Sequence, residues 1–118
     1  MKNTRTNYLG ELSRDNIGSE VVVMGWVKKH RDLGELIFMD IRDVTGISQV
    51  VVNNTNVEIF NFTKELKTEY VVAIKGMVRE RQDINPDIKT GDIEIIATEI
   101  ELINKAKVTP IIIDDNID

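Results

Sequence analysis

The chain of 118 residues is 42% hydrophobic, 30% charged and 5% aromatic, which is typical of one globular domain and excludes a disordered chain. It contains no cysteine and one histidine, which excludes disulfides, thiolate zinc sites and any metal site built from several histidines of this chain. The net charge of −5 argues weakly against nucleic acid, but residues 1–31 hold six Lys and Arg against three acids, and such a local basic patch can bind phosphates.

Alternating apolar and β-branched residues predict three strands in the first half of the chain. Clusters of Gly, Asp and Thr between them predict tight turns, so the three strands should form a meander. The strands are predicted at residues 21–27, 36–42 and 47–53, and the turns at residues 33–35 and 43–46.

The pattern changes after the third strand. Apolar residues at helical spacing, preceded by asparagines that can cap a helix, predict a helix at residues 56–67. Strands follow at residues 70–81, where Gly76 marks a bulge or bend, and at residues 93–103. Residues 82–91 contain Asp, Asn, Pro and Gly without periodicity, which predicts a loop.

This order of elements predicts an all-β fold, a five-stranded Greek-key barrel of the OB-fold type with one helix between strands three and four. Gly25 and Gly76 suit the corners where a small barrel bends. A β-sandwich is the alternative, but it needs more strands than the sequence offers. We expect residues 1–106 to form the barrel and residues 107–118 to form a linker toward a domain that the sequence does not include.

Alternation on the second predicted strand separates two faces. Ile37, Met39 and Ile41 form an apolar set that points into the barrel, so Phe38 points outward beside charged residues. An exposed aromatic ring on such a sheet is a stacking platform for an unpaired base. A ring covered by a loop or by the helix fits the same pattern, so both interpretations stay open here.

Polar and basic residues gather around the same predicted face. Gln49 lies where its carboxamide can reach a base edge, with an ordinary exposed glutamine as the alternative. Cations near a stacking platform favour a track for a nucleic-acid backbone, with a solvated charged surface as the alternative. These cations end the first and fourth predicted strands: Lys28, Lys29, His30, Arg31, Arg79 and Arg81.

The sequence contains no recognisable active site. His30 has no cysteine partner, and no serine lies in a nucleophile motif. The glycines are scattered singly, so there is no glycine-rich phosphate loop. Asp40, Arg42 and Asp43 are predicted to form ion pairs on the barrel surface. We therefore expect a binding module without catalytic residues or a bound cofactor.

Several sequence blocks carry a resemblance to a known family. The specific ones are Gly25-Trp26-Val27, Arg31-Asp32-Leu33-Gly34, the run from Leu36 to Asp43, Gly46-Ile47 and Gln49-Val50. They resemble the N-terminal anticodon-binding domain of bacterial aspartyl-tRNA synthetases, and the similarity spans nearly the whole chain. Class II synthetases for asparagine and lysine share a looser version of these blocks and stay as alternatives.

The resemblance implies an OB-fold that grips a tRNA anticodon loop with its bases splayed out. Phe38 matches the aromatic residue that stacks on the middle anticodon base, a uridine. Gln49 matches the residue that reads the edge of that uridine, and Arg31 matches an arginine at the same site.

The resemblance also implies contacts to the two other anticodon bases. Arg81 and the following loop, including Asn85, match the region that meets the third base, a cytidine. Glu94 matches the acid that meets the first base, a guanine or modified guanine, whose N1–H and N2–H a carboxylate can accept. Lys28, Lys29, His30 and Arg79 are then candidates for contacts to the RNA backbone.

Three features depart from the family pattern. Val51 stands where many bacterial members have an aromatic residue, which removes a second stacking surface. Lys29-His30 replaces a pair of arginines, which weakens planar, bidentate contacts to phosphate. The loop at residues 82–90 is shorter than in some relatives.

The resemblance implies that the whole enzyme is a cytoplasmic, homodimeric aspartate–tRNA ligase that joins aspartate to tRNA(Asp) through an aspartyl-adenylate. ATP and Mg²⁺ are then expected in a catalytic domain beyond Asp118. No apolar run approaches the ~18 residues of a membrane span, and the first residues lack the apolar stretch of a secretory signal, so no membrane partner is expected. A general single-strand binding module and a protein-interaction barrel remain alternatives.

Overall fold

Five strands and one α-helix make up the computed structural model, which describes residues 4–105. The predicted linker at residues 107–118 lies outside the described residues. The 3-10 helices are η1 (Leu9–Glu11) and η2 (Arg14–Asn16), the α-helix is α1 (Val57–Lys64), and the strands are β1 (Glu20–Asp32), β2 (Leu36–Asp43), β3 (Gly46–Asn53), β4 (Val71–Glu80) and β5 (Ile93–Asn104).

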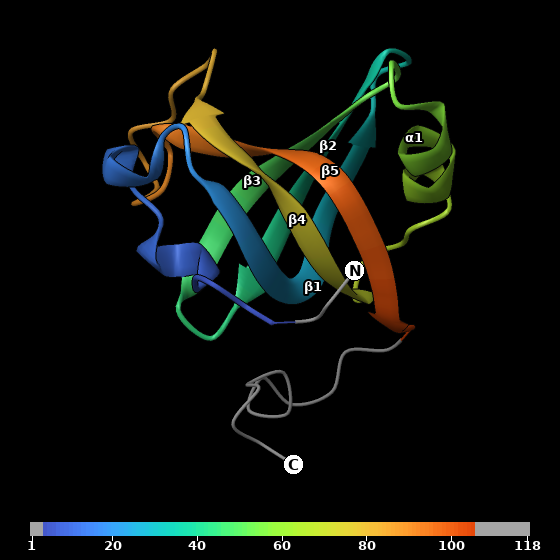
Figure 1. The fold of residues 1–118 in the computed structure, drawn as a ribbon, viewed down its shortest axis with the longest axis horizontal. Helices are drawn as coiled ribbons and strands as arrows, with labels where there is room; N and C mark the ends of the chain where they lie inside the picture. The colour runs from blue at the N-terminus through green and yellow to red at the C-terminus, as the bar shows by residue number, and fades with distance from the viewer. Residues whose placement is uncertain (1–3, 106–118) are drawn as a thin grey trace.

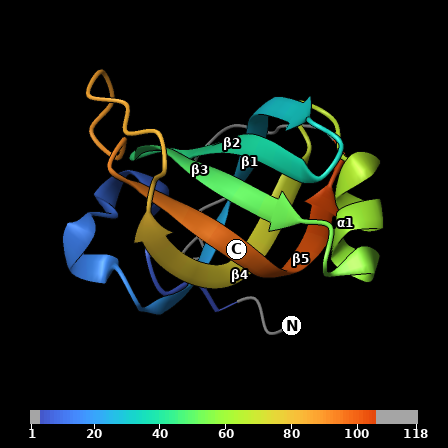
Figure 2. The same ribbon diagram turned by 90° about the horizontal axis from the view of Figure 1, so that it is seen from above.

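The strands close into a barrel in the order β1-β2-β3-β5-β4 (Figures 1 and 2). All neighbouring strands are antiparallel except β3 and β5, which pair in parallel. The first half of β1 pairs with β4 and its second half pairs with β2, so this one long strand closes the sheet. The predicted five-stranded OB-fold with its helix between strands three and four is therefore confirmed, and the sandwich is excluded.

The two predicted barrel corners depend on glycine because the strands approach closely there. A Cβ atom at Gly25 would collide with the carbonyl oxygen of Arg42, and one at Gly76 with the carbonyl oxygen of Ile96. The β4–β5 register also shifts between Lys75 and Gly76. Any side chain at either position would force the two strands apart.

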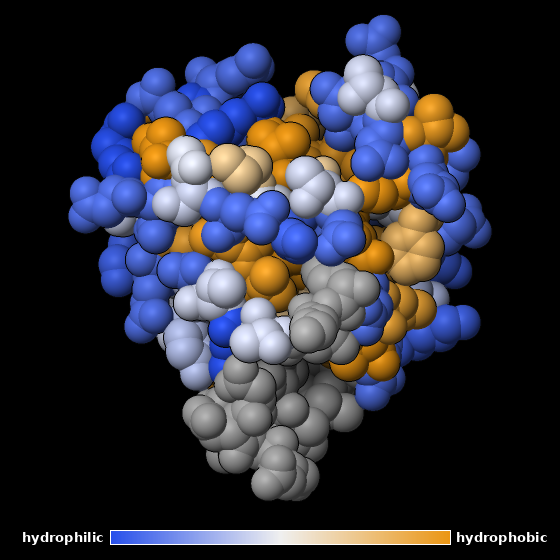
Figure 3. All heavy atoms as spheres, in the orientation of Figure 1, coloured by the Kyte–Doolittle hydropathy of each residue, from blue (hydrophilic) through white to orange (hydrophobic). Residues whose placement is uncertain are grey.

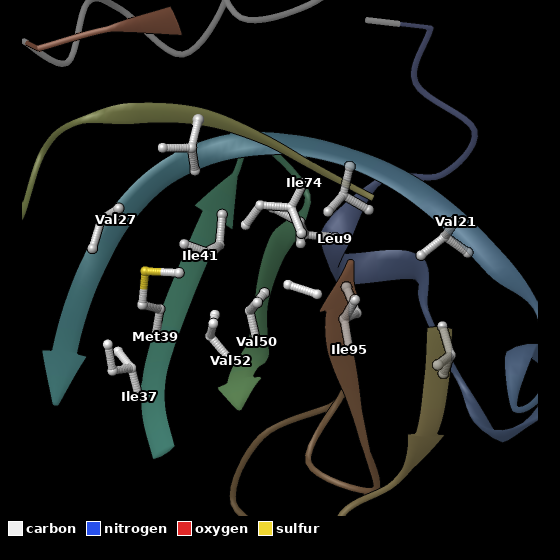
Figure 4. Packing of buried hydrophobic residues seen from close by; sticks show 14 of the residues in the cluster. Leu9, Val21, Val27, Ile37, Met39, Ile41, Val50, Val52, Ile74 and Ile95 are labelled. Atoms are coloured by element: carbon white, nitrogen blue, oxygen red, sulfur yellow. The ribbon is translucent and has the colours of Figure 1, made fainter. Parts of the chain in front are cut away.

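Inward-facing aliphatic side chains fill the barrel (Figure 4). The predicted inward set on β2 is confirmed, since Ile37, Met39 and Ile41 are fully buried. Helix α1 covers one end of the barrel with Phe60 (Figure 1). It begins after Asn56, whose side chain accepts a hydrogen bond from the Ile59 amide, and it is shorter than the sequence predicted.

The N-terminal segment covers the opposite end of the barrel, which the sequence did not predict. Leu9 begins η1 and Leu12 follows it, and these two side chains are 0% and 1% exposed within the core. The Ser48 hydroxyl donates to the Leu9 carbonyl at 2.7 Å, which fixes this segment to β3. The backbone of Gly10 lies so close to Thr45 that only glycine fits there.

Asp43 does not form the surface ion pair that the sequence suggested. Its side chain is 2% exposed, and its Oδ2 accepts from the Leu9 amide at 2.7 Å. Its Oδ1 accepts from the amide and the hydroxyl of Thr45, at 2.8 and 2.6 Å. The prediction was wrong because the donors are two backbone amides and a neutral hydroxyl, which the spacing of charged residues does not reveal. Asp43 instead joins the β2–β3 turn to the N-terminal segment.

Within residues 4–105, every helix is too short or too polar to cross a membrane. On the face shown in Figure 3, hydrophobic side chains form several small areas separated by hydrophilic ones. This mixture is ordinary for a protein surface in contact with water.

Candidate nucleic-acid interface

Phe38 lies on the outer face of β2, half-buried between its neighbours on both adjacent strands. The register places it opposite Arg31 of β1 and Val51 of β3. The Arg31 guanidinium carbon is 5.5 Å from the ring centroid, a cation–π distance. Val51 is only 1% exposed, so it supports the ring from the side and offers no second surface.

Phe38 is one of the residues that line a cavity of about 530 Å³. The cavity lies between the turn after β1 and the loop between β4 and β5, which projects from the barrel in Figure 2. Two smaller cavities of about 260 and 330 Å³ share Phe38 and Gln49 with it. The main cavity is lined by Arg31, Leu33, Phe38, Gln49, Arg81, Asp83, Ile84, Asn85 and Pro86.

Leu33 and Ile84 are site residues that sequence reasoning missed. They are 59% and 44% exposed, and both line the cavity beside Phe38. One comes from the turn at residues 33–35 and the other from the loop at residues 82–91, both of which the sequence predicted as loops. Two exposed aliphatic residues in the loops that flank a proposed binding face were the available signal.

Gln49 is the centre of a hydrogen-bonded chain that crosses the outer face of three strands. The Nη2 atom of Arg81 donates to Gln49 Oε1 at 2.5 Å, and Gln49 Nε2 donates to Glu94 Oε1 at 2.8 Å. The Nε atom of Arg79 donates to Glu94 Oε2 at 2.7 Å. Cross-strand register creates these contacts, because Glu94 of β5 lies opposite Gln49 of β3 and Arg79 of β4.

The Glu94 side chain is only 3% exposed although it points away from the core. A buried carboxylate is tolerated only when it is paired and hydrogen-bonded, and here both oxygens have a partner. The Arg81 Nε atom is also buried, and it has no hydrogen-bond partner in the described part of the chain. The site therefore combines a satisfied carboxylate with a buried donor that lacks a partner among the described residues.

The four candidate contacts to the RNA backbone do not lie together. Lys29 lines one of the smaller cavities next to Phe38, and Arg79 lines the other. Lys28 Nζ lies 3.7 Å from a carboxylate oxygen of Glu69, and the His30 Nε2 atom lies 2.8 Å from the Thr63 carbonyl oxygen at the end of α1.

Strand alternation explains why His30 and Lys29 separate. His30 is in register with the inward-facing Met39, whereas Lys29 is in register with Asp40 on the Phe38 face. An irregularity between Val27 and Lys29 takes Lys28 out of the register. The charged run at residues 28–31 is therefore split between different sides of the barrel.

The loop that carries Asn85 is held by hydrogen bonds at its base. The Asn85 amide donates to the Gly91 carbonyl at 3.0 Å, and the Arg81 amide donates to the Asp92 carbonyl at 2.9 Å. Arg14 of η2 contacts carboxylates on both sides of the loop, Glu80 at 2.8 Å and Asp92 at 3.2 Å. Hydrogen bonding to Glu80, ahead of the attraction of Asp92, raises the pKa of Arg14.

Among residues 4–105, no group of three or more His, Asp or Glu side chains is arranged to hold a metal ion. The arrangement around Phe38 instead offers an aromatic face, amide and carboxylate edges and guanidinium groups, which are the groups that bind unpaired nucleotides.

Comparisons with known proteins agree with this geometry. Residues 21–103 match the tRNA anticodon family, described as an OB-fold nucleic acid binding domain. The chain is 46% identical over 116 residues to the aspartate–tRNA(Asp/Asn) ligase of Moorella thermoacetica, covering 97% of this chain and 19% of the relative. It is 46% identical over 115 residues to the aspartate–tRNA ligase of Enterococcus faecalis, covering 95% of this chain and 20% of the relative.

A solved structure with the same fold is that of asparaginyl-tRNA synthetase from Pyrococcus horikoshii complexed with asparaginyl-adenylate. It aligns with a TM-score of 0.72 and 30% identity, over 96% of this chain and 25% of that one. The chain thus spans about a fifth of the length of the curated relatives it matches, and about a quarter of this structure.

Proposed function

The chain belongs to the tRNA anticodon-binding family of OB-fold domains, in the form found in bacterial aspartate–tRNA ligases, and we propose that it selects tRNA(Asp) by binding the anticodon. The observation that carries this proposal is the half-buried Phe38 ring, which lines a cavity of about 530 Å³ and has the Arg31 guanidinium over it at 5.5 Å from the ring centroid. Such a ring stacks an unpaired base, and stacking of this kind contributes about 1–3 kcal/mol per base.

Phe38 stacks on the middle anticodon base, a uridine, and Gln49 reads the edge of that uridine. Arg31 stabilises the stacked ring by a cation–π contact, since its guanidinium lies over Phe38 at 5.5 Å from the ring centroid. Glu94 accepts hydrogen bonds from the first base, a guanine, which presents two N–H donors side by side. Arg81 and Asn85 line the same cavity and meet the third base, a cytidine.

Lys29 and Arg79 are the proposed backbone candidates that line cavities next to Phe38. Lys28 and His30 were proposed for the same task, but their present partners are Glu69 and the Thr63 carbonyl.

The longer protein that contains this barrel is proposed to be a cytoplasmic, homodimeric ligase that joins aspartate to tRNA(Asp) through an aspartyl-adenylate. ATP and Mg²⁺ are then bound by the part of the relatives that this chain does not span. Residues 1–106 serve as the anticodon-binding domain, and the chain after it serves as the linker to the catalytic domain.

A broader specificity is the second candidate, because the Moorella thermoacetica relative is an aspartate–tRNA(Asp/Asn) ligase. The anticodons for aspartate and asparagine differ in their third base, so Arg81 and Asn85 are the residues whose contacts would decide between them. Equal affinity for the two stem-loops would favour the broader specificity.

Competition binding tests the proposal. A labelled aspartate anticodon stem-loop is bound to the 118-residue chain at one fixed salt concentration and displaced by unlabelled stem-loops with one anticodon base changed. We expect the altered loops to compete more weakly than the matched loop. Equal competition by all loops would indicate a general single-strand binding module, and no RNA binding in dilute salt would indicate a protein-interaction barrel.

A further inference from the structure

Gln49 and Glu94 hold one another before any RNA is bound. The Gln49 amide already uses its oxygen on Arg81 and one N–H on Glu94, and each Glu94 oxygen already accepts one hydrogen bond. These two residues are assigned above to two neighbouring bases. Gln49, which is proposed to read the middle base, is therefore hydrogen-bonded to Glu94, which is proposed to read the first base.

Burial makes this bond strong enough to matter. The Glu94 side chain is 3% exposed, so water cannot replace a lost partner without a rearrangement of its surroundings. A carboxylate reads guanine well only when both of its oxygens lie in the plane of the two N–H donors. The Gln49 bond at one oxygen and the Arg79 bond at the other restrict the rotation of that carboxylate.

We propose that Gln49, Glu94 and Arg79 read the first and middle anticodon bases as one coupled unit, in which Arg79 positions the Glu94 carboxylate. This inference rests on the proposed function and adds that the two bases are not read independently. It also gives Arg79 a task different from the phosphate contact that the sequence suggested. Its Nε atom is committed to Glu94, whereas its side chain is 46% exposed overall.

A double-substitution cycle tests the coupling. The Gln49→Ala, Glu94→Ala and doubly substituted chains are titrated with the matched stem-loop and with loops altered at the first base or at the middle base. The measured quantity is base preference, the ratio of the affinities for matched and altered loops. Gln49→Ala should lower the preference at the first base by about threefold or more, because contacting residues couple by amounts of this order.

The same cycle predicts a less than multiplicative loss. Glu94→Ala should lower the preference at the middle base. The fold-loss of base preference in the doubly substituted chain should be about threefold smaller than the product of the fold-losses in the two singly substituted chains. If Gln49→Ala leaves the first-base preference at the wild-type value, or if the losses multiply, the coupling is refuted. If the wild-type chain itself prefers no loop, the proposed function fails and the coupling fails with it.

Arg79 needs a readout that separates positioning from phosphate contact. Arg79→Ala should lower the first-base preference while the slope of affinity against salt stays unchanged. A uniform loss for all loops, with a salt slope smaller by about 0.7, would instead show a phosphate contact and overturn the positioning role. Thermal melting identifies any variant that fails to fold, and Arg79→Lys, which keeps a charge near the buried carboxylate, then replaces Arg79→Ala.

Lys75→Ala is the matched control for Arg79→Ala. Lys75 lies on the outer face of the same strand, and its Nζ is 3.9 Å from Glu99 of β5. The Lys75→Ala substitution therefore removes a β4 cation that, like Arg79, has a glutamate partner on β5. Neither Lys75 nor Glu99 lines any of the cavities around Phe38. We expect Lys75→Ala to leave both base preferences at their wild-type values, and a loss equal to that of Arg79→Ala would refute a specific role for Arg79.

Discussion

Two buried carboxylates lie in different regions of this barrel, and their partners differ in kind. Asp43, at the β2–β3 turn, accepts from two backbone amides and a hydroxyl. Glu94, on the face around Phe38, accepts from the side chains of Gln49 and Arg79. Backbone donors fix a carboxylate permanently as part of the fold, whereas side-chain donors can turn toward a ligand. Under the proposed function, the first arrangement serves stability and the second serves recognition.

The largest expected effect is the loss of stability when Asp43 is replaced. Asp43→Ala should lower the free energy of unfolding by about 2–4 kcal/mol, because buried donors of Leu9 and Thr45 lose a charged acceptor. Urea denaturation of the variant and the wild type measures this loss. The base preferences of the folded variant should be unchanged, and a loss of preference would break the division of tasks between the two carboxylates.

Phe38→Ala should lower affinity for the matched anticodon stem-loop by about 1–3 kcal/mol through the loss of stacking. The fold should survive because the ring is half-buried on the outer face, beside Val51, and outside the barrel core. Phe38→Tyr is the control, since it keeps an aromatic face and should retain most of the affinity. An unchanged affinity for Phe38→Ala would remove the stacking role.

Glu94→Ala should have the opposite effects to Asp43→Ala, with a clear loss of base preference and a small loss of stability. We expect a loss of about 1–2 kcal/mol in the preference for guanine at the first anticodon base, measured by competition between stem-loops. The free energy of unfolding should fall by about 1 kcal/mol or less, because Arg79 is half-exposed and can return to water. A loss of stability as large as that of Asp43→Ala would mean that both carboxylates are structural.

The smallest expected effect concerns charge alone. Lys29→Ala should reduce the slope of log affinity against log salt by about 0.7 and leave base preference unchanged, as expected when one phosphate contact is lost. Lys28→Ala is the matched control, because its ammonium group lies next to Glu69. Equal salt slopes for the two variants would show that strand alternation does not decide which of these lysines contacts a phosphate.

The sequence predicted the strands, the helix and the barrel because alternation and turn chemistry are local properties. It missed the N-terminal end of the barrel, since Leu9 and Leu12 show no period that marks them as core residues. It treated residues 28–31 as one basic group, although a strand sends neighbouring side chains to opposite faces. Alternation applied to this run would have separated His30 from Lys29.

The candidate site was predicted residue by residue but not as a network. Phe38 and Gln49 followed from alternation, and the family resemblance suggested Glu94. The bond between Gln49 and Glu94 joins residues 45 positions apart, and it depends on the register of the parallel β3–β5 pair. No local pattern sets that register, so the contact becomes visible only once the barrel is closed.

The N-terminal segment has a practical consequence for anyone who transplants this barrel into another polypeptide. A fusion junction or truncation that removes Leu9 together with the residues before it would discard the amide that Asp43 binds and the leucine that closes one end of the barrel. Thr6 adds a further tether, because its backbone amide donates to the Val22 carbonyl at 2.9 Å. Engineered versions should therefore keep the segment before β1 intact, or supply other apolar side chains in place of Leu9 and Leu12.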